Sequence, residues 1–216
     1  MFLKRNKKYF FVLYFLKLKF SLKFVVNATE AFFKFSPGKV VTLFRLKLFH
    51  LFMPLKLIIL DLDGTLWSHK DISSTSPPFT RIDDETLVDS ANNFVKLDPC
   101  ARRLLESAKK KGILLAIASW NNPDIALQAL RVLGLDGFFD FPVVEPHPGK
   151  DRMVEKILAE LGVDAEYAVF VDDTDYMVEL VRARFPRMSV YRVGEDIQNL
   201  CHLMDKVCLN ACCKQK

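Results

Sequence analysis

The sequence predicts an α/β fold, a three-layer doubly wound sheet of four or five parallel strands with helices on both faces. From residue 55 onward, short apolar runs alternate with helical segments that have turn residues at their ends. This alternation is the pattern of a parallel sheet with crossover helices. The chain of 216 residues is long enough for one such domain with an appendage, and too short for two full domains.

Five short apolar runs are interpreted as the buried strands, because they are too short for core helices and lie between turn residues. They cover 55–60, 113–118, either 138–141 or 142–144, 167–171 and 189–193. The polar segment after the first strand contains two stretches, 79–82 and 93–97, that we expect to pair as a small hairpin. So short an insertion predicts a minimal cap, or none, over the sheet.

Helices are predicted from their end signals. Asp98-Pro99 is expected to begin one, with Asp98 as N-cap, and Gly112 follows its basic last turn. Asn122-Pro123 begins the next, which ends at Gly134. Three more are predicted over 149–161, 175–185 and 196–207.

Charge divides the chain in two. The net charge is +5, from 31 Lys and Arg against 26 Asp and Glu. Residues 1–52 hold 11 of the basic residues, 12 of the 19 Phe and a single acid, Glu30, so the remainder is mildly acidic. Because the basic excess lies outside the predicted domain, the charge gives no reason to expect nucleic-acid binding.

The leader, residues 1–52, has three interpretations. Its longest uncharged run near the start, 9–16, is far below the roughly 20 apolar residues of a spanning helix. It is therefore a membrane-surface anchor or weak secretory signal through 1–26, a targeting presequence, or sequence upstream of a native start at Met53. We favour the last, with a domain over 53–208, a cysteine-containing tail over 209–216 and a cytoplasmic location.

Cysteine usage supports that location. Four of the five cysteines lie in the last 16 residues, without a CxxC pair or a histidine at zinc-finger spacing. We expect free thiols in a reducing compartment rather than a redox or metal-binding tail. The sequence leaves the oligomeric state open.

Acidic and polar residues follow the predicted strands at the points where ligands bind in doubly wound sheets. Asp61-Leu62-Asp63-Gly64-Thr65 follows the first strand and Ser119-Trp120-Asn121 the second. Lys150 opens a helix, and Asp172-Asp173 follows a later strand. We expect all four groups to meet at one edge of the sheet.

This combination of carboxylates, a serine hydroxyl and a lysine ammonium predicts phosphoryl transfer. Four ionised carboxylates need a cation between them, and oxygen ligands favour Mg²⁺. Lys150 and the backbone amides after Ser119 would hold phosphate oxygens. The substrate would be a phosphorylated small molecule or protein.

These motifs resemble those of the haloacid dehalogenase superfamily of phosphatases, and among them the magnesium-dependent phosphatase-1 family. The resemblance covers about 54–200. It implies a Rossmann-like fold and an Mg²⁺-dependent phosphomonoester hydrolase that forms an aspartyl phosphate. Trp120-Asn121 departs from the basic residue that better-known members carry after the serine, which leaves the substrate open.

The resemblance also implies roles. Asp61 would attack phosphorus, and Asp63 would protonate the leaving alcohol and later deprotonate water. Mg²⁺ would be bound by Asp61, the Asp63 main-chain carbonyl and Asp173, with help from Asp172. Ser119 and Lys150 would hold the phosphate oxygens, and Thr65 would support the first loop. Trp120 and Asn121 are the candidates for contact with the substrate.

Other functions remain open. A receiver-like domain that accepts a phosphoryl group without hydrolysing it uses a similar set of residues, but in another order along the chain. A phosphotransferase or a dehalogenase could use the same scaffold. The nearly open site predicted here admits a bulky substrate, such as a phosphotyrosine side chain of a protein, and equally a sugar phosphate.

Overall fold

The computed structural model describes residues 55–209. The predictions made for the leader, for a start at Met53 and for residues 210–216 lie outside the described residues. Within 55–209, no helix is long and apolar enough to cross a membrane.

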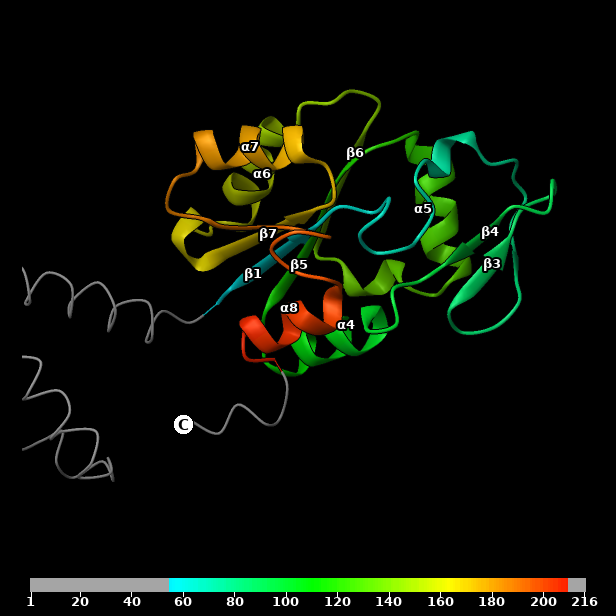
Figure 1. The fold of residues 1–216 in the computed structure, drawn as a ribbon, viewed down its shortest axis with the longest axis horizontal. Helices are drawn as coiled ribbons and strands as arrows, with labels where there is room; N and C mark the ends of the chain where they lie inside the picture. Colours follow the sequence, from blue (N-terminus) through cyan, green and yellow to red (C-terminus); the bar gives the residue numbers. More distant parts are fainter. Residues whose placement is uncertain (1–54, 210–216) are drawn as a thin grey trace, which may run out of the picture. The chain divides into compact units, whose positions relative to one another are not determined.

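Five parallel strands form the central sheet, as predicted (Figure 1). The spatial order is β6-β5-β1-β7-β8. The chain therefore builds one side of the sheet from β1 to β6 and then returns to the other side of β1 with β7 and β8. The strands are β1 (Leu57–Leu60), β5 (Leu114–Trp120), β6 (Phe141–Glu145), β7 (Ala168–Asp172) and β8 (Ser189–Arg192).

Helices cover both faces of this sheet. On one face, residues such as Leu57 and Phe170 pack against α6 and α7. On the other, residues such as Ile58 and Val171 pack against α4, α5 and α8, and Figure 1 shows the two helical layers on opposite sides. The helices are α4 (Ala101–Lys110), α5 (Pro123–Val132), α6 (Lys150–Leu161), α7 (Asp175–Arg184) and α8 (Leu200–Lys206).

Two predicted helix starts are wrong. The helix α4 begins at Ala101 and has Cys100 rather than Asp98 at its cap position. The last helix begins at Leu200 rather than at residue 196, with Asn199 accepting a bond from the His202 amide. The predicted cap of α5 is confirmed, since Asn122 accepts from the Asp124 amide and Pro123 follows it.

The insertion after β1 differs from the predicted hairpin. It contains the short 3-10 helix η1 (Ile72–Ser74) and an antiparallel sheet of three strands. β3 (Thr86–Val88) lies between β2 (Thr80–Arg81) and β4 (Phe94–Lys96), so the two predicted partners do not pair with each other. Leu87 and Val95 from this small sheet enter the core beneath it.

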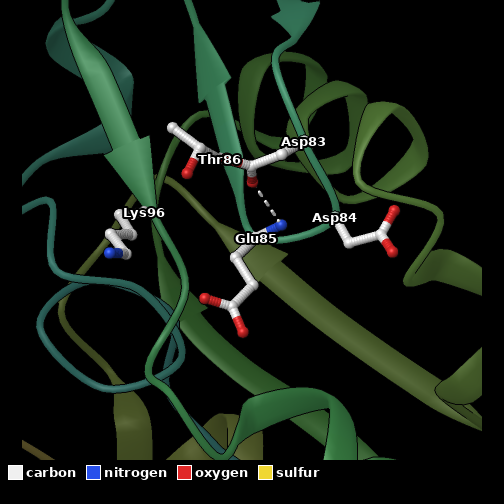
Figure 2. A pocket seen from close by; sticks show the side chains of 5 residues that line it. All are labelled: Asp83, Asp84, Glu85, Thr86 and Lys96. Carbon is white, nitrogen blue, oxygen red and sulfur yellow. Dashed lines mark hydrogen bonds between the residues drawn. The ribbon is translucent and has the colours of Figure 1, made fainter.

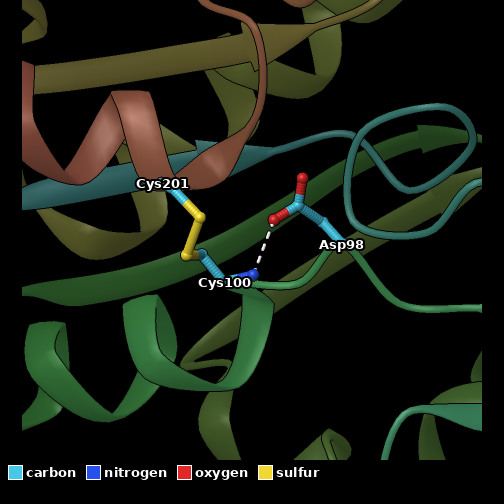
Figure 3. A group of neighbouring side chains, drawn as sticks. All are labelled: Asp98, Cys100 and Cys201. Carbon is cyan, nitrogen blue, oxygen red and sulfur yellow. Dashed lines mark hydrogen bonds between the residues drawn. A yellow bond between two sulfur atoms is a disulfide. The ribbon is translucent and has the colours of Figure 1, made fainter.

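The free-thiol prediction is wrong for two cysteines. Cys100 and Cys201 form a disulfide that joins the start of α4 to α8 (Figure 3). Asp98 reinforces this junction: its carboxylate accepts from the Cys100 amide at 2.8 Å and from the Leu200 amide at 3.2 Å. The 101-residue separation hid the pair in the sequence. Cys208 is a free, exposed thiol.

Candidate active site

The candidate site lies at the carboxyl ends of β1, β5 and β7. The order in which strands join the sheet reverses between β1 and β7, because β5 and β6 lie on one side of β1 and β7 and β8 on the other. Such a switch point leaves a crevice where ligands bind. β1 ends at Leu60, opposite Ile117 of β5. β5 continues through Trp120, where β6 alone pairs with it. This unequal length leaves room beside Ala118 for the loop that follows β1.

That loop turns sharply at Gly64. Its φ of +66° is one that side chains disfavour, and its amide donates to the His69 carbonyl at 2.9 Å. The amides of Thr65, Leu66 and Trp67 all donate to the carbonyl of Leu62. The turn follows directly on Asp61, whose carboxylate lies beside Asp172 at the end of β7.

Lys150 is the buried cation of the site. It begins α6, yet its side chain runs inward and is almost fully buried. Its ammonium forms an ion pair with Asp61 and donates to the Ala118 carbonyl at 2.7 Å. Asp172 Oδ2 lies 2.9 Å away, in an ion pair without the alignment of a hydrogen bond. Lys150 thus links the ends of β1, β5 and β7.

The charges do not balance. Burial raises the pKa of the Asp61 carboxyl from 3.8 to about 7; Lys150 opposes this rise and Asp172 adds to it. For Lys150, burial lowers the pKa, but the two carboxylates outweigh that effect and the net direction is upward. A single ammonium faces two buried carboxylates, so negative charge remains in excess. A further cation would relieve it.

Asp173 adds a third carboxylate. One oxygen from each of Asp61, Asp172 and Asp173 lies within 4.8 Å of the other two. Lys70, from the loop after β1, reaches Asp173 Oδ2 at 2.6 Å with a side chain that is largely exposed. Because three carboxylate oxygens converge, the donor set suits a hard divalent cation such as Mg²⁺.

Asp63 lies beside this cluster and is hydrogen-bonded on both oxygens. Trp67 Nε1 donates to Oδ1 at 2.6 Å and Asn121 Nδ2 to Oδ2 at 2.9 Å. The Ile72 amide is shared between them at 3.2 and 3.1 Å. Burial raises the pKa of Asp63, and the hydrogen bonds from Trp67, Asn121 and Ile72 oppose that rise.

The residues at the carboxyl end of β5 divide between the interior and the solvent. Ser119 is fully buried and its hydroxyl accepts from Asn121 Nδ2 at 2.9 Å. Asn121 is buried too, so its side chain faces Asp63 and Ser119 rather than a substrate. Trp120 is 52% exposed at the end of the strand. It is therefore the member of this group that is open to a bulky ligand.

One expectation about donors needs correction. The amides of Asn121 and Asn122 already donate to the Glu145 carbonyl and to Ser73 Oγ, so both of these amides have partners within the protein. The Thr65 hydroxyl is buried without a hydrogen-bond partner among the described residues. Thr65 supports the first loop through its backbone amide.

Sequence reasoning missed Trp67 as a hydrogen-bond partner of Asp63. The available signal was chemical: a buried indole N–H needs an acceptor, and Asp63 lies four residues earlier. It also missed Lys70 and Ser73, for which the sequence carries no comparable signal.

A separate open pocket of about 520 Å³ lies at the small sheet, around the turn between β2 and β3. Figure 2 shows its lining side chains, and the Glu85 amide donates to Asp83 at 2.8 Å. None of the predicted site residues lines it. The lining residues are Asp83, Asp84, Glu85, Thr86 and Lys96.

A parallel doubly wound sheet with clustered carboxylates and a buried lysine at its switch point is typical of proteins that transfer phosphoryl groups, and the family match makes this one a hydrolase of phosphate esters. Residues 53–183 match the model of the acid phosphatase family, and the chain belongs to this family. It is also 30% identical to human magnesium-dependent phosphatase 1 over 120 residues, which are 55% of this chain and 67% of that protein.

Solved structures share the fold. The N-terminal part of the protein BF1531 from Bacteroides fragilis, which contains a phosphatase domain and was solved with Mg, matches with a TM-score of 0.53 and 20% identity. The match covers 80% of this chain but 45% of that one. A HAD-superfamily hydrolase from Ehrlichia chaffeensis matches with a TM-score of 0.52 and 16% identity, over 72% of this chain and 97% of its own. The predicted fold class is confirmed, and so is the predicted relation to the magnesium-dependent phosphatase-1 family.

Proposed function

We propose that this phosphatase is an Mg²⁺-dependent phosphomonoester hydrolase that works through a phosphorylated Asp61. The observation that carries the proposal is the contact of Asp61 and Asp172 with the buried ammonium of Lys150, with Asp173 close enough to share a cation. Such a site binds a phosphoryl group between a lysine and a metal, with a carboxylate aligned to attack.

Asp61, Asp172 and Asp173 would hold Mg²⁺, together with the main-chain carbonyl of Asp63. When bound, the ion supplies positive charge that shields the nucleophile from the phosphate and lowers the pKa of the Asp61 carboxyl. This suits the raised pKa of Asp61, because the carboxylate must be ionised to attack. The magnesium dependence named for the human relative supports the same choice of ion.

The protein groups would divide the remaining work. Asp61 Oδ forms a bond to phosphorus while the bond to the leaving oxygen breaks, and Asp63 gives that oxygen its proton. Water then attacks phosphorus and passes a proton to Asp63, which frees Asp61. Lys150 and Ser119 would hold the equatorial oxygens, where negative charge develops.

The substrate is a phosphomonoester, and we propose a phosphorylated protein side chain or a sugar phosphate. The exposed Trp120 at the end of β5 would contact its leaving group. The short insertion with η1 supports access for bulky molecules. We expect Trp120→Ala to raise KM for such substrates and to leave the melting temperature unchanged. The same change at Phe94, which is 62% exposed on the small sheet, should not alter KM.

The test is a panel of phosphomonoesters, including 4-nitrophenyl phosphate, assayed with and without Mg²⁺. We expect turnover that EDTA abolishes and Mg²⁺ restores, and loss of turnover in Asp61→Asn. Asp136→Asn, which removes an exposed charge before the amino end of β6, is the matched control and should stay active. Full activity in EDTA would refute the metal role. A single stoichiometric phosphorylation without turnover would favour the receiver-like alternative instead.

The leader, the domain bounds 53–208 and a cytoplasmic location stay proposals. Comparing residues 53–216 with the full chain in vesicle sedimentation tests the leader. Equal recovery in the supernatant would argue against a membrane-surface anchor in residues 1–26.

A further inference from the structure

The carboxylate of Asp63 is held by three donors from separate segments. Trp67 lies four residues on, Ile72 belongs to η1, and Asn121 follows β5. Their donor nitrogens lie between 2.6 and 3.2 Å from the two carboxylate oxygens. Because each oxygen accepts at least one bond, the carboxyl plane cannot rotate without breaking a bond.

Asn121 is itself fixed in orientation. Its Nδ2 donates to Asp63 Oδ2 and to Ser119 Oγ, both at 2.9 Å. Its Oδ1 accepts from Ser73 Oγ at 2.7 Å. The Ser73 hydroxyl in turn accepts from the Asn122 amide at 2.8 Å. A flipped amide would place two acceptors face to face at Asp63, so the network determines which atom of Asn121 faces the carboxylate.

A stabilising role alone does not explain this arrangement. Asp63 is only partly buried, so water could solvate part of its carboxylate, yet both oxygens accept hydrogen bonds from protein groups. Here the indole of a fully buried tryptophan and the amide of a buried asparagine both point to it. Buried donors aimed at a partly exposed acid restrict its position, which is what a proton-transfer group requires.

We propose that Trp67 and Asn121 are positioning residues that orient the Asp63 carboxyl toward the leaving oxygen of the substrate. This inference rests on the proposed function. With one lone pair of each oxygen engaged by Trp67 or Asn121, the proton of the acid form is carried on a remaining lone pair. As the bond from phosphorus to the leaving oxygen breaks, that proton moves to the oxygen and leaves Asp63 as carboxylate.

Dependence on the leaving group distinguishes this role from a structural one. An alkoxide leaving group needs a proton, whereas 4-nitrophenolate departs without one. Loss of a positioning bond should therefore slow the first step for an alkyl phosphate and spare it for the aryl ester. A general loss of folding or of phosphate binding would slow both alike.

The experiment compares the full chain with Trp67→Phe and Asn121→Ala in single-turnover release of alcohol from an alkyl phosphate and from 4-nitrophenyl phosphate. Since general acid catalysis contributes about 100-fold or more, we expect a loss of about tenfold or more in each variant on the alkyl ester. On the aryl ester the loss should stay below about threefold. KM should change little for either substrate.

Leu97→Val is the matched control, because Leu97 is buried beside Trp67 and the change keeps every donor. It should leave the ratio of alkyl to aryl rates unchanged. Asp63→Asn removes the acid itself and therefore defines the largest loss of rate expected on the alkyl ester. Adding Trp67→Phe to Asp63→Asn should cause no further loss on that ester.

Equal losses on both esters, or none, in a folded variant would overturn the proposal. If Trp67→Phe does not fold, the ratio of alkyl to aryl rates measured for Asn121→Ala decides whether the proposal holds. A wild-type chain without Mg²⁺-dependent turnover would instead overturn the proposed function itself.

Discussion

Gly64 and Asp173 approach each other so closely that no side chain fits between them. A Cβ built on Gly64 would lie 2.2 Å from Asp173 Oδ2 and 2.6 Å from Lys70 Nζ. The turn that follows β1 therefore touches the acidic pair that ends β7, and the geometry of the carboxylate cluster depends on the absence of a methyl group.

Gly64→Ala should displace Asp173 and weaken Mg²⁺ binding, measured by calorimetry, by more than tenfold. It should also destabilise the protein, because a positive φ costs an alanine about 1–2 kcal/mol. Gly112→Ala separates the two effects: its φ is +69° but nothing lies within 4 Å of the added Cβ. This control should lose stability and keep its magnesium affinity. Equal affinities in both variants would contradict the prediction.

Lys150→Met should lower both activity and stability. Removing one partner of a buried ion pair costs about 3–5 kcal/mol, because the remaining charge stays buried. We expect a lower melting temperature that Mg²⁺ raises more than it does in the wild type, since the ion replaces lost positive charge. Lys156→Met, on the same helix but exposed and paired with Glu145, should cost less than about 1 kcal/mol. Similar melting temperatures for the two variants would argue against the prediction.

Asp89 should make part of the protein's folding stability sensitive to acid. Burial raises its pKa, but donors at Ser76, Asn93 and Ala91 outweigh burial and lower the pKa from 3.8 to about 2. A lowered pKa means that the stabilisation is complete above pH 4 and is lost as the pH falls toward 2. Melting temperatures of wild type and Asp89→Asn should thus differ most above pH 4 and converge near pH 2. A difference that stays constant across this range would contradict the assignment.

Reduction of the Cys100–Cys201 disulfide should destabilise the domain. The bond closes a loop of about a hundred residues, and such cross-links typically contribute about 2–4 kcal/mol. A reducing agent and Cys100→Ser should therefore lower the melting temperature to the same extent. Cys208→Ser, at the free and exposed thiol, should not. If reduction leaves the wild-type melting temperature unchanged, the disulfide does not form in solution.

The main sheet could be predicted because runs such as Leu57–Leu60 are wholly apolar, which suits a strand buried on both faces. The small sheet could not. β3 spans three residues, of which Leu87 alone is fully buried, so no hydrophobic pattern marks it. The disulfide was hidden for another reason, since only the packing of α8 on α4 brings its cysteines together.

The candidate site was predictable in outline, because strand direction determines which loops share an edge of a parallel sheet. Its internal contacts were not. The sequence places Lys150 at a helix start but does not reveal that its side chain turns inward to Ala118. Likewise, Asn121 looked available to a substrate, and only its hydrogen bonds to Asp63 and Ser119 show where its amide is engaged.

The alternation of side chains along β5 ties the orientation of Ser119 to the packing of the core. Leu115 and Ile117 face the layer of α4 and α5, and Ser119 points the same way by the two-residue period of a strand. Inserting one residue before Ala118 would carry the hydroxyl to the α6 layer while barely changing the composition of the protein. In this strand, a sequence change that preserves hydrophobicity would still remove the hydroxyl from the place where we propose that it binds phosphate, so tolerance to insertion tests that proposed role.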